Sequence, residues 1–427
     1  MSGLPTMKRE ELTRRSGTSR TILAAKIMAS PVKNYDLFRA SVSELPPDAI
    51  EKAFAWLAGS GPFPTPTTIH FDLTLRCTAR CTHCSQWTWP AQPELGRQDL
   101  ERLVSLFAEW GVSTLTLAGG NPLLHSELPF VLKAAEKAGI RTGIVTESIQ
   151  EMSADLVDAI GGRASWIRFS LDGPTSQVHD QIRRTPGLFD SVVNSIRELR
   201  RNSTSLPIGI NCVVQRQNVR HLDGMLRLAR ELGVNAMLFK ISHGPDPGDR
   251  FILSKPDYDF FHDWVEGASE GQYDVETNLG ELKAMLQHVF CPEGIIGGRP
   301  VGAFYVQHQV MCFVPLFFLI CDSHANAYPC DYLQADTRPW QGPFRILREH
   351  YRLGNFLVDP SAVIRTLSET MFDRIHRLPS AANEECGCCT RFCQLNAGLT
   401  HLRSNVQEGI TRSFTDESSS RSDVTFL

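Results

Sequence analysis

Apolar residues follow two alternating periods between positions 69 and 241. Stretches with every second residue apolar predict β-strands, and stretches with apolar residues three or four apart predict helices. The predicted strands lie at 69–75, 113–117, 141–146, 166–171, 207–214 and 236–241. The predicted helices between them lie at 100–107, 127–138, 153–160, 192–199 and 222–232. This alternation indicates an α/β domain with a parallel sheet.

Six strand–helix units in succession fit two architectures. One is a partial (β/α)6 barrel of the TIM type, and the other is an open, doubly wound sheet. In both architectures, binding and catalytic residues gather at the carboxyl ends of the strands. We therefore expect functional residues directly after the predicted strands.

The sequence on either side of this alternation predicts four further regions. Residues 1–65 are expected to form a helical extension, with a helix at 47–57, and a proline-rich linker. Cysteines become dense and helical periodicity becomes scarce after position 290, which favours a small domain held together by metal. The expected regions are a barrel core at 66–250, a connecting helical segment at 251–305, a cysteine-rich domain at 306–400 and a disordered tail at 401–427.

Charge and composition narrow the class of protein. A formal net charge of −4 gives no strong attraction to nucleic acid or to an anionic membrane. The first twenty residues lack the apolar core of a signal peptide, and the longest apolar run, 313–320, is too short to span a bilayer. We therefore expect a cytoplasmic protein without nucleic-acid or membrane partners. In that compartment, twelve cysteines favour metal binding over disulfides.

Three of the cysteines lie in one octet, residues 77–84, directly after the first predicted strand. Cys77, Cys81 and Cys84 are separated by three and then two residues. Three thiolates this close can share one metal centre, and three ligands on a four-iron cubane leave one iron open to a small molecule. A zinc site is the alternative, although structural zinc prefers paired Cys-x2-Cys motifs and four protein ligands. A chance group of thiols is the third interpretation.

The octet resembles the signature of the radical S-adenosylmethionine (radical SAM) enzymes, and the resemblance covers roughly residues 67–245. Gly-Gly-Asn-Pro at 119–122 is similar to the family's usual Gly-Gly-Glu-Pro, and Ser-Leu-Asp-Gly at 170–173 also matches. The resemblance implies a partial (β/α)6 TIM-like barrel with a [4Fe–4S] cluster on the three cysteines. It also implies that SAM binds the open iron, is cleaved by one electron to a 5′-deoxyadenosyl radical, and that this radical abstracts a substrate hydrogen.

The same resemblance assigns cofactor contacts to small and polar residues that follow the strands: Gly119, Gly120, Asn121, Pro122, Ser170, Asp172 and Asn211. The Gly-Gly loop would bind the methionyl amino group through its backbone, and Asn121 would accept a hydrogen bond without the charge of the usual acid. Ser170 would meet the methionyl carboxylate or the ribose, and Asn211 the ribose hydroxyls. Each of these residues also has an ordinary explanation in turns and caps.

Other residues near the strand ends carry weaker signals. Arg183 and Arg184 are expected on a solvated basic face, with one guanidinium reaching the cofactor carboxylate as the alternative. Cys212 is expected to fill the interior of its strand. Trp87 and Trp89 either line a substrate cavity or pack.

The cysteine-rich region resembles the SPASM domain, the auxiliary-cluster extension of the radical SAM family. Its usual Asp-Pro-Asp-Gly-Asn-Val-Tyr-Pro-Cys appears as Asp-Ser-His-Ala-Asn-Ala-Tyr-Pro-Cys at 322–330. The ligands that this resemblance favours for one auxiliary cluster are Cys312, Cys330, Cys386 and Cys389. A second cluster would draw on Cys321, Cys388 and Cys393, or on Cys291. One or two auxiliary [4Fe–4S] clusters are therefore expected.

The resemblance implies an oxidoreductase or maturase in the biosynthesis of a natural product. A ribosomally made peptide is the first substrate class, because this pair of domains is commonest there. A dehydrogenase or epimerase that acts on a small molecule, such as an aminocyclitol, a nucleoside sugar or a tetrapyrrole, is the alternative. A non-catalytic iron–sulfur or zinc protein and an electron-transfer protein are different classes of function. The expected partners are the substrate and a flavodoxin- or ferredoxin-type electron donor.

Overall fold

The computed structural model describes the predicted barrel and part of the cysteine-rich region. The described residues are 61–84, 86–88, 93–149, 151–242, 253–268, 274–280, 317–329 and 352–377, with single residues at 49, 52, 55, 251, 282 and 283. The predictions for most of the helix at 47–57, most of the connecting segment, Cys312, the cysteines beyond 329 and the tail lie outside these residues.

The first six strands are parallel and neighbour one another in sequence order. They are β1 (Thr68–Thr74), β2 (Thr114–Gly119), β3 (Arg141–Thr146), β4 (Trp166–Ser170), β5 (Ile208–Val214) and β6 (Ala236–Ile241). A short strand, β7 (Glu276–Thr277), continues the parallel sheet beyond β6. A doubly wound sheet would reverse its strand order at a switch point. The sequential order therefore confirms the α/β fold with a partial barrel and excludes the open alternative.

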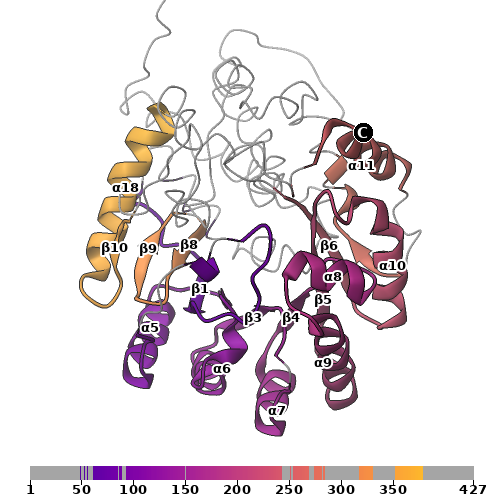
Figure 1. Ribbon diagram of the computed structural model, residues 1–427. Helices are drawn as coiled ribbons and strands as arrows, with labels where there is room; N and C mark the ends of the chain where they lie inside the picture. Colours follow the sequence, from indigo (N-terminus) through magenta and orange to yellow (C-terminus); the bar gives the residue numbers. More distant parts are fainter. Residues whose placement is uncertain are drawn as a thin grey trace, which may run out of the picture.

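Helices cover the outer side of the curved sheet (Figure 1). They are α5 (Arg97–Glu109), α6 (Leu128–Lys137), α7 (Ala154–Arg163), α9 (Leu188–Asn202) and α10 (Leu222–Glu231). Helix α8 (Ser176–Arg183) lies at the carboxyl ends of the strands, and α11 (Lys255–Gly267) follows β6 in the chain. Short 3-10 turns lie at η1 (Gln86–Thr88), η2 (Pro122–Leu124) and η3 (Val219–His221). The predicted cap of the third helix is confirmed, because the Ser153 side chain accepts a hydrogen bond from Leu156 N. Helix α8 was not predicted, since its eight residues are too few to show a helical period.

The two faces of the sheet differ in polarity. Ile69, Phe71 and Leu73 of β1 are fully buried in the apolar core with side chains of the helices. Each such side chain contributes roughly 1.5–3 kcal/mol when it leaves water. The alternate residues of β1, among them His70 and Asp72, are polar and face the inner side. On β2, His70 pairs in register with Thr116 and Asp72 with Ala118. The inner side of the barrel is thus more polar than the outer side, although it also holds a small apolar cluster of Trp166, Ala236 and Val145.

A segment from far along the chain extends the sheet beyond β1. Strand β8 (Phe318–Cys321) pairs parallel with β1, and β9 (Asn326–Tyr328) and β10 (Gly354–Asn355) add antiparallel strands. Asp322 forms the turn between β8 and β9, because its Oδ1 accepts hydrogen bonds from His324 N (2.9 Å) and Asn326 N (2.8 Å). Helix α18 (Pro360–Arg377) lies beside β10 (Figure 1). Residues 318–328, expected in a separate small domain, therefore continue the barrel sheet.

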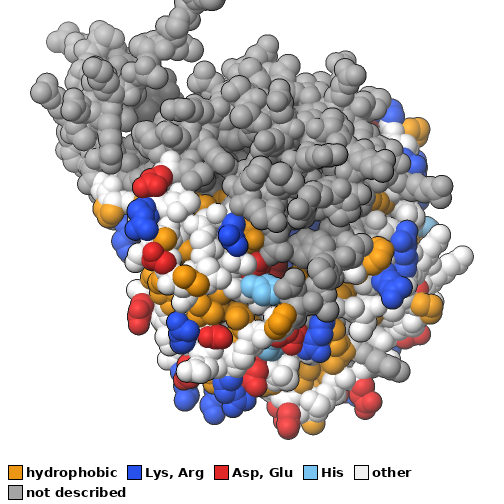
Figure 2. Space-filling view, turned by 60° about the vertical axis from the view of Figure 1, so that its left-hand side comes forward, with side chains coloured by type: hydrophobic (Ala, Val, Ile, Leu, Met, Phe, Trp, Pro, Cys, Tyr) orange, Lys and Arg blue, Asp and Glu red, His pale blue; other side chains and the backbone are white. Residues whose placement is uncertain are grey.

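The surface carries mixed charge. On the face shown in Figure 2, Lys and Arg side chains are interspersed with Asp and Glu. None of the described helices is both long and apolar enough to cross a bilayer.

Candidate active site

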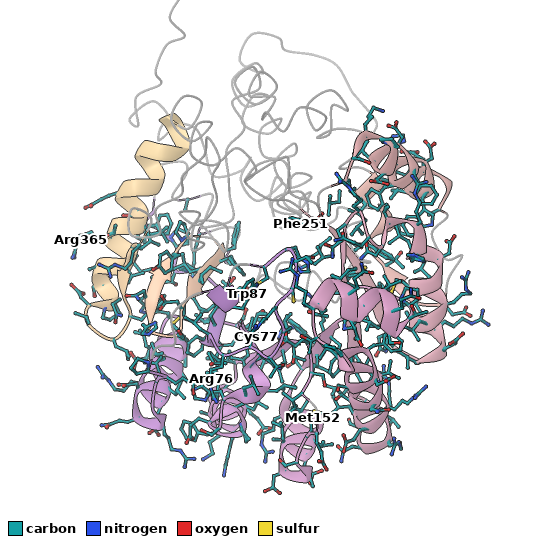
Figure 3. The ribbon with its side chains drawn as sticks, viewed as in Figure 1. Arg76, Cys77, Trp87, Met152, Phe251 and Arg365 are labelled. Atoms are coloured by element: carbon teal, nitrogen blue, oxygen red, sulfur yellow. The ribbon has the colours of Figure 1, made fainter. Side chains whose placement is uncertain are left out.

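The cysteine octet forms an irregular loop directly after β1. Two backbone hydrogen bonds fasten it to the end of α8: Arg80 N donates to Arg183 O (3.1 Å), and Thr82 N donates to Ile182 O (3.0 Å). Cys81 is buried, Cys77 and Cys84 are half-buried, and all three thiols are free. Figure 3 shows Cys77 on the inner side of the arc of helices. The loop thus stands at the carboxyl end of β1, where the sequence places it.

Two buried charged side chains from other elements contact the octet. Cys77 Sγ donates a hydrogen bond to Glu147 Oε1 at 2.8 Å, and Arg183 Nη1 donates to Cys81 Sγ at 3.4 Å. Burial raises the pKa of the Cys81 thiol to about 11, although Arg183 opposes the shift. Burial, and then the neighbouring Glu147, raise the pKa of the Cys77 thiol far above its usual range. The free thiols are therefore neutral, and ligation of a metal releases their protons.

Arg183 is held by a buried ion pair. Its Nε lies 2.7 Å from Asp172 Oδ2, and both side chains are buried. Although burial opposes ionisation, Arg183 lowers the pKa of Asp172 below its usual range. The other carboxylate oxygen of Asp172 accepts from Val213 N at 2.7 Å. Asp172 thereby positions the arginine that reaches Cys81, and its contact with the cofactor stays a prediction.

The expectation of a solvated basic face is wrong for Arg183 and holds for Arg184. Helix α8 ends at Arg183, and Arg184 takes the left-handed conformation with φ +53°. This change of direction leaves Arg184 exposed, while Arg183 stays 6% exposed within the site. The sequence shows two adjacent arginines but not the helix end that separates their environments.

The glycine loop after β2 packs against the start of the octet. Gly120 N donates to Thr74 O and Asn121 N donates to Arg76 O, both at 2.7 Å. A Cβ atom on Gly119 would lie 2.3 Å from Thr74 O, and one on Gly120 would lie 2.2 Å from Arg76 O. Neither distance is possible for a real side chain, so two glycines are needed to bring the loop this close to the cysteines.

The Asn121 side chain is hydrogen-bonded within the protein, and its contact with the cofactor stays a prediction. Its Oδ1 accepts from Leu123 N (3.1 Å) and Thr146 Oγ1 (2.8 Å), and its Nδ2 donates to Ser148 O (2.6 Å). Both acceptor positions of the amide oxygen are therefore occupied, and the side chain is completely buried. Asn121 thus fastens the glycine loop to the end of β3. Pro122 is buried as the first residue of η2.

Ser170 and Asn211 are paired neighbours on β4 and β5 and lie on the polar inner face. Ser170 is half-buried and Asn211 is 5% exposed. Asn211 Oδ1 has no hydrogen-bond partner among the described residues. An unsatisfied buried acceptor costs about 1–3 kcal/mol. The amide is therefore suited to a donor from a bound molecule, such as a hydroxyl group.

Glu147 is the residue that sequence reasoning missed. It is the first residue after β3 and is 5% exposed. Its position at the carboxyl end of a predicted strand is the signal that marked Ser170 and would also have marked Glu147. Gln215, directly after β5, was missed in the same way, and its Oε1 accepts from Thr82 Oγ1 at 3.1 Å.

The remaining predicted residues divide into packing residues and residues outside the described ranges. Cys212 is fully buried in the apolar core, as expected, and Trp87 is 39% exposed. Cys321 pairs in register with Phe71 on the outer face and is also fully buried in that core. The residues outside the described ranges are Trp89, Cys291, Cys312, Cys330, Cys386, Cys388, Cys389 and Cys393.

A family model described as the radical SAM superfamily matches residues 72–247. The barrel domain belongs to the radical SAM superfamily. The protein is accordingly a radical SAM enzyme, and that family uses a [4Fe–4S] cluster and SAM.

Three known proteins show the range of this similarity. The AdoMet-dependent heme synthase of Methanosarcina barkeri is 26% identical over 310 residues, which are 69% of this chain and 85% of that protein. The PqqA peptide cyclase of Ruegeria pomeroyi is 30% identical over 178 residues, 41% of this chain and 46% of that protein. The crystal structure of Streptococcus suis SuiB bound to S-adenosylmethionine has a TM-score of 0.55 at 14% identity, and covers 78% of this chain and 72% of SuiB. The crystal structure of SuiB bound to precursor peptide SuiA has a TM-score of 0.50 at 13% identity. That match covers 66% of this chain and 62% of the SuiB chain.

The radical SAM barrel has a donor set that fits the cofactors of its family. Three thiols share one loop, and the glycine loop packs against it. Asn211 leaves an acceptor open on the inner face. The described part of the chain holds no three metal-ligating side chains that converge on a single ion. A cubane distributes its ligands over several irons, so its thiolates need not converge.

Proposed function

We propose that Cys77, Cys81 and Cys84 hold the [4Fe–4S] cluster with which this enzyme cleaves SAM. The observation that carries the proposal is the contact of Arg183 with Cys81 inside a buried loop that also meets the glycine loop of β2. When bound, the cluster supplies the electron that cleaves SAM, and the resulting 5′-deoxyadenosyl radical takes a hydrogen atom from the substrate.

The residues of the chain bind and orient the cofactor. The backbone of Gly119 and Gly120 approaches the octet closely enough to meet the methionyl group, because no side chain stands between. Asn211 and Ser170 face the inner side, where their polar atoms suit ribose hydroxyls. The guanidinium of Arg183 donates to the Cys81 sulfur and balances its charge when the thiolate forms.

We infer a ribosomally made peptide as the substrate. The PqqA peptide cyclase has the higher identity of the two relatives above, and SuiB, which shares the fold, is known bound to a precursor peptide. A small molecule of the tetrapyrrole class is the second candidate. The heme synthase favours it, because that match extends over 85% of the heme synthase, whereas the cyclase match covers 46% of the cyclase.

We also propose a core at 66–250, a connecting segment at 251–305 and an auxiliary-cluster region at 306–400, of which residues 318–328 extend the barrel sheet. Its proposed cluster ligands are Cys312, Cys330, Cys386, Cys389 and Cys393. An auxiliary cluster that accepts an electron from the substrate would make the net reaction a two-electron oxidation. A flavodoxin- or ferredoxin-type protein in the cytoplasm is the proposed electron donor.

The test uses the full chain, reconstituted anaerobically with iron and sulfide, with dithionite and SAM. We expect 5′-deoxyadenosine from the wild type and none from Cys81→Ala. Absence of 5′-deoxyadenosine from the iron-loaded wild type would overturn the proposal and favour a non-catalytic iron–sulfur protein.

Deuterium transfer identifies the substrate class. Deuterated precursor peptides and deuterated tetrapyrroles are supplied separately, and the 5′-deoxyadenosine is analysed by mass spectrometry. Transfer from a peptide supports the first candidate. Transfer from a tetrapyrrole alone excludes a peptide as the substrate and supports the second candidate, a small molecule of the tetrapyrrole class.

A further inference from the structure

We propose that the wall formed by the octet and the end of helix α8 is, on its solvent side, the docking surface for an acidic electron donor of the flavodoxin type. Arg80 and Arg184 mark this surface. The inference rests on the proposed function, because a donor is needed only if the octet holds a cluster that is reduced from outside. It adds the place on the protein where the electron enters.

A single layer of backbone separates the octet from solvent at this wall. Two backbone hydrogen bonds, at 3.1 and 3.0 Å, join the octet to the end of α8. On the inner side, Cys81 is 5% exposed and its sulfur accepts a hydrogen bond from the Arg183 guanidinium. On the outer side, the Arg80 side chain is exposed, and one peptide bond joins Arg80 to Cys81. An electron that enters here therefore has a short covalent path to a proposed cluster ligand.

The wall presents two positive charges to solvent. Arg80 and Arg184 are both exposed, and the hydrogen bond from Arg80 N to Arg183 O brings their backbones together. Neither guanidinium forms an ion pair with a carboxylate of the described residues. The other two arginines at the octet, Arg76 and Arg183, are each held in an ion pair. The charges that remain for a partner are therefore those of Arg80 and Arg184.

An open depression adjoins Arg184. The residues that line it with Arg184 are Ser176, Gln177, Asp180, Gln181 and Pro186. Asp180 is the acid of this lining, and both of its carboxylate oxygens already accept backbone hydrogen bonds, from Gly187 N at 2.7 Å and from Phe189 N at 2.9 Å. Asp190, in the first turn of α9, is exposed but lies outside the lining. A partner that enters the depression meets mostly neutral side chains and the charge of Arg184.

The charge and the position of the surface select the class of partner. Exposed arginines at the rim of a contact attract a negatively charged protein and raise its rate of association more than the final affinity. Such a contact suits a carrier that binds, delivers one electron and leaves. The reduced donor loses one electron and the oxidised cluster gains it, with no bond formed or broken. An acidic precursor peptide fits the charge but brings no electron to the ligand behind the wall, so the position favours the donor.

The experiment measures docking and electron transfer separately. The enzyme is the full chain loaded with iron and sulfide, and the probe is a purified flavodoxin of net negative charge. Surface plasmon resonance without SAM gives the association rate and the dissociation constant. Absorbance spectroscopy then follows reduction of the cluster by reduced flavodoxin and, in parallel, by photoreduced 5-deazariboflavin, a small uncharged reductant that needs no docking surface.

Arg184→Glu and the double variant Arg80→Glu/Arg184→Glu reverse the charge of the wall. We expect the double variant to bind flavodoxin about tenfold more weakly at low ionic strength, through slower association, with a smaller difference as salt is added. Reduction by flavodoxin should slow by a similar factor relative to reduction by 5-deazariboflavin. The matched control, Arg197→Glu/Arg201→Glu, changes the net charge equally at two exposed arginines of α9, on the outer side of the barrel (Figure 1), and should change neither quantity.

Several results overturn the docking surface. They are an unchanged flavodoxin affinity in the double variant, an equal loss in the α9 control, and a wild type that binds no flavodoxin. If the double variant takes up too little iron, Arg184→Glu serves alone, with an expected loss of about threefold, and an unchanged affinity overturns the proposal. Charge reversal that spares flavodoxin but weakens binding of deca-glutamate, a model acidic peptide, assigns the surface to a peptide instead.

The same measurements separate this inference from the proposed function. A wild type that makes 5′-deoxyadenosine with 5-deazariboflavin but binds no flavodoxin overturns the docking surface alone. An iron-loaded wild type that makes no 5′-deoxyadenosine with either reductant overturns the proposed function.

Discussion

The cysteines at the ends of two neighbouring parallel strands, β1 and β8, have opposite environments. After β1 the chain leaves the sheet, and Cys77 and Cys81 meet buried charged groups from β3 and α8. At the end of β8, Cys321 stays within the strand, and its sulfur lies in the apolar core at 3.6 Å from the carbonyl oxygen of Asp322. The difference shows that a cysteine near a strand end becomes a candidate metal ligand only where the chain leaves the β-strand and forms a loop.

The two strand ends also differ in what stabilises them. The turn after β8 satisfies its polar groups locally, since Asp322 bonds to residues two and four positions later. The octet depends on side chains and loops that are distant in sequence, including Glu147 and the glycine loop. We therefore expect substitutions around the octet to affect chemistry, and substitutions around the β8 turn to affect stability alone.

The largest expected difference separates Cys81 from Cys321. Cys81→Ala removes one of three protein ligands, so SAM cleavage should fall to about one-hundredth or less, with loss of iron. Cys321→Ala should keep the cluster on the octet and cleave SAM at near the wild-type rate, while the free energy of unfolding falls by about 1–2 kcal/mol. Iron analysis, 5′-deoxyadenosine production and denaturation measure the three effects. Equal loss of activity in both variants would contradict the comparison.

Arg183 and Arg184 provide the next test. Arg183→Met leaves Asp172 buried without its cation, which should cost about 3–5 kcal/mol of stability. The variant should also lose the hydrogen bond to Cys81 and cleave SAM more slowly at equal iron content. Arg184→Met is the matched control, because that side chain is exposed, and it should resemble the wild type in both assays. A stable Arg183→Met protein would show that the buried ion pair is not needed.

Gly120 tests whether the β2 loop must touch the octet. A methyl group at this position meets Arg76 O and Leu75 C, so Gly120→Ala should displace the loop at a cost of about 1–3 kcal/mol. SAM should bind roughly tenfold more weakly to the variant. Gly162→Ala, in α7 with no atom within 4 Å of the added carbon, should leave binding unchanged. Unchanged SAM affinity in Gly120→Ala would separate the glycine loop from the cofactor site.

The smallest expected effect belongs to the β8 turn. Asp322→Ala removes an acceptor for two backbone N–H groups, so the free energy of unfolding should fall by about 1–2 kcal/mol. SAM cleavage at a temperature well below unfolding should not change. Loss of SAM cleavage in this folded variant would mean that β8 and the octet act together.

The sequence predicts the barrel better than it predicts the contacts of the site. Residues 141–146 and 236–241 are confirmed as strands with the same bounds, because short segments of apolar and β-branched residues between helices are typical of buried strands. The octet and the Gly119–Gly120 loop were found because their residue types are unusual. Glu147 and the inward Arg183 were not found, since an isolated acid and a pair of arginines are ordinary on a surface. Their environment arises from tertiary contacts between elements 70 and 102 residues apart.

The pairing of β1 with β8 has a consequence for how the protein is made. Thr67, next to β1, bonds to Phe317, next to β8, across 250 residues of chain. At ordinary rates of translation, roughly 10 to 50 seconds separate the synthesis of the two strands. During that interval the strand that carries the octet is an open sheet edge, a hazard for pairing with other chains. A ribosome-bound chain that lacks β8 is therefore the state in which this enzyme most needs a chaperone.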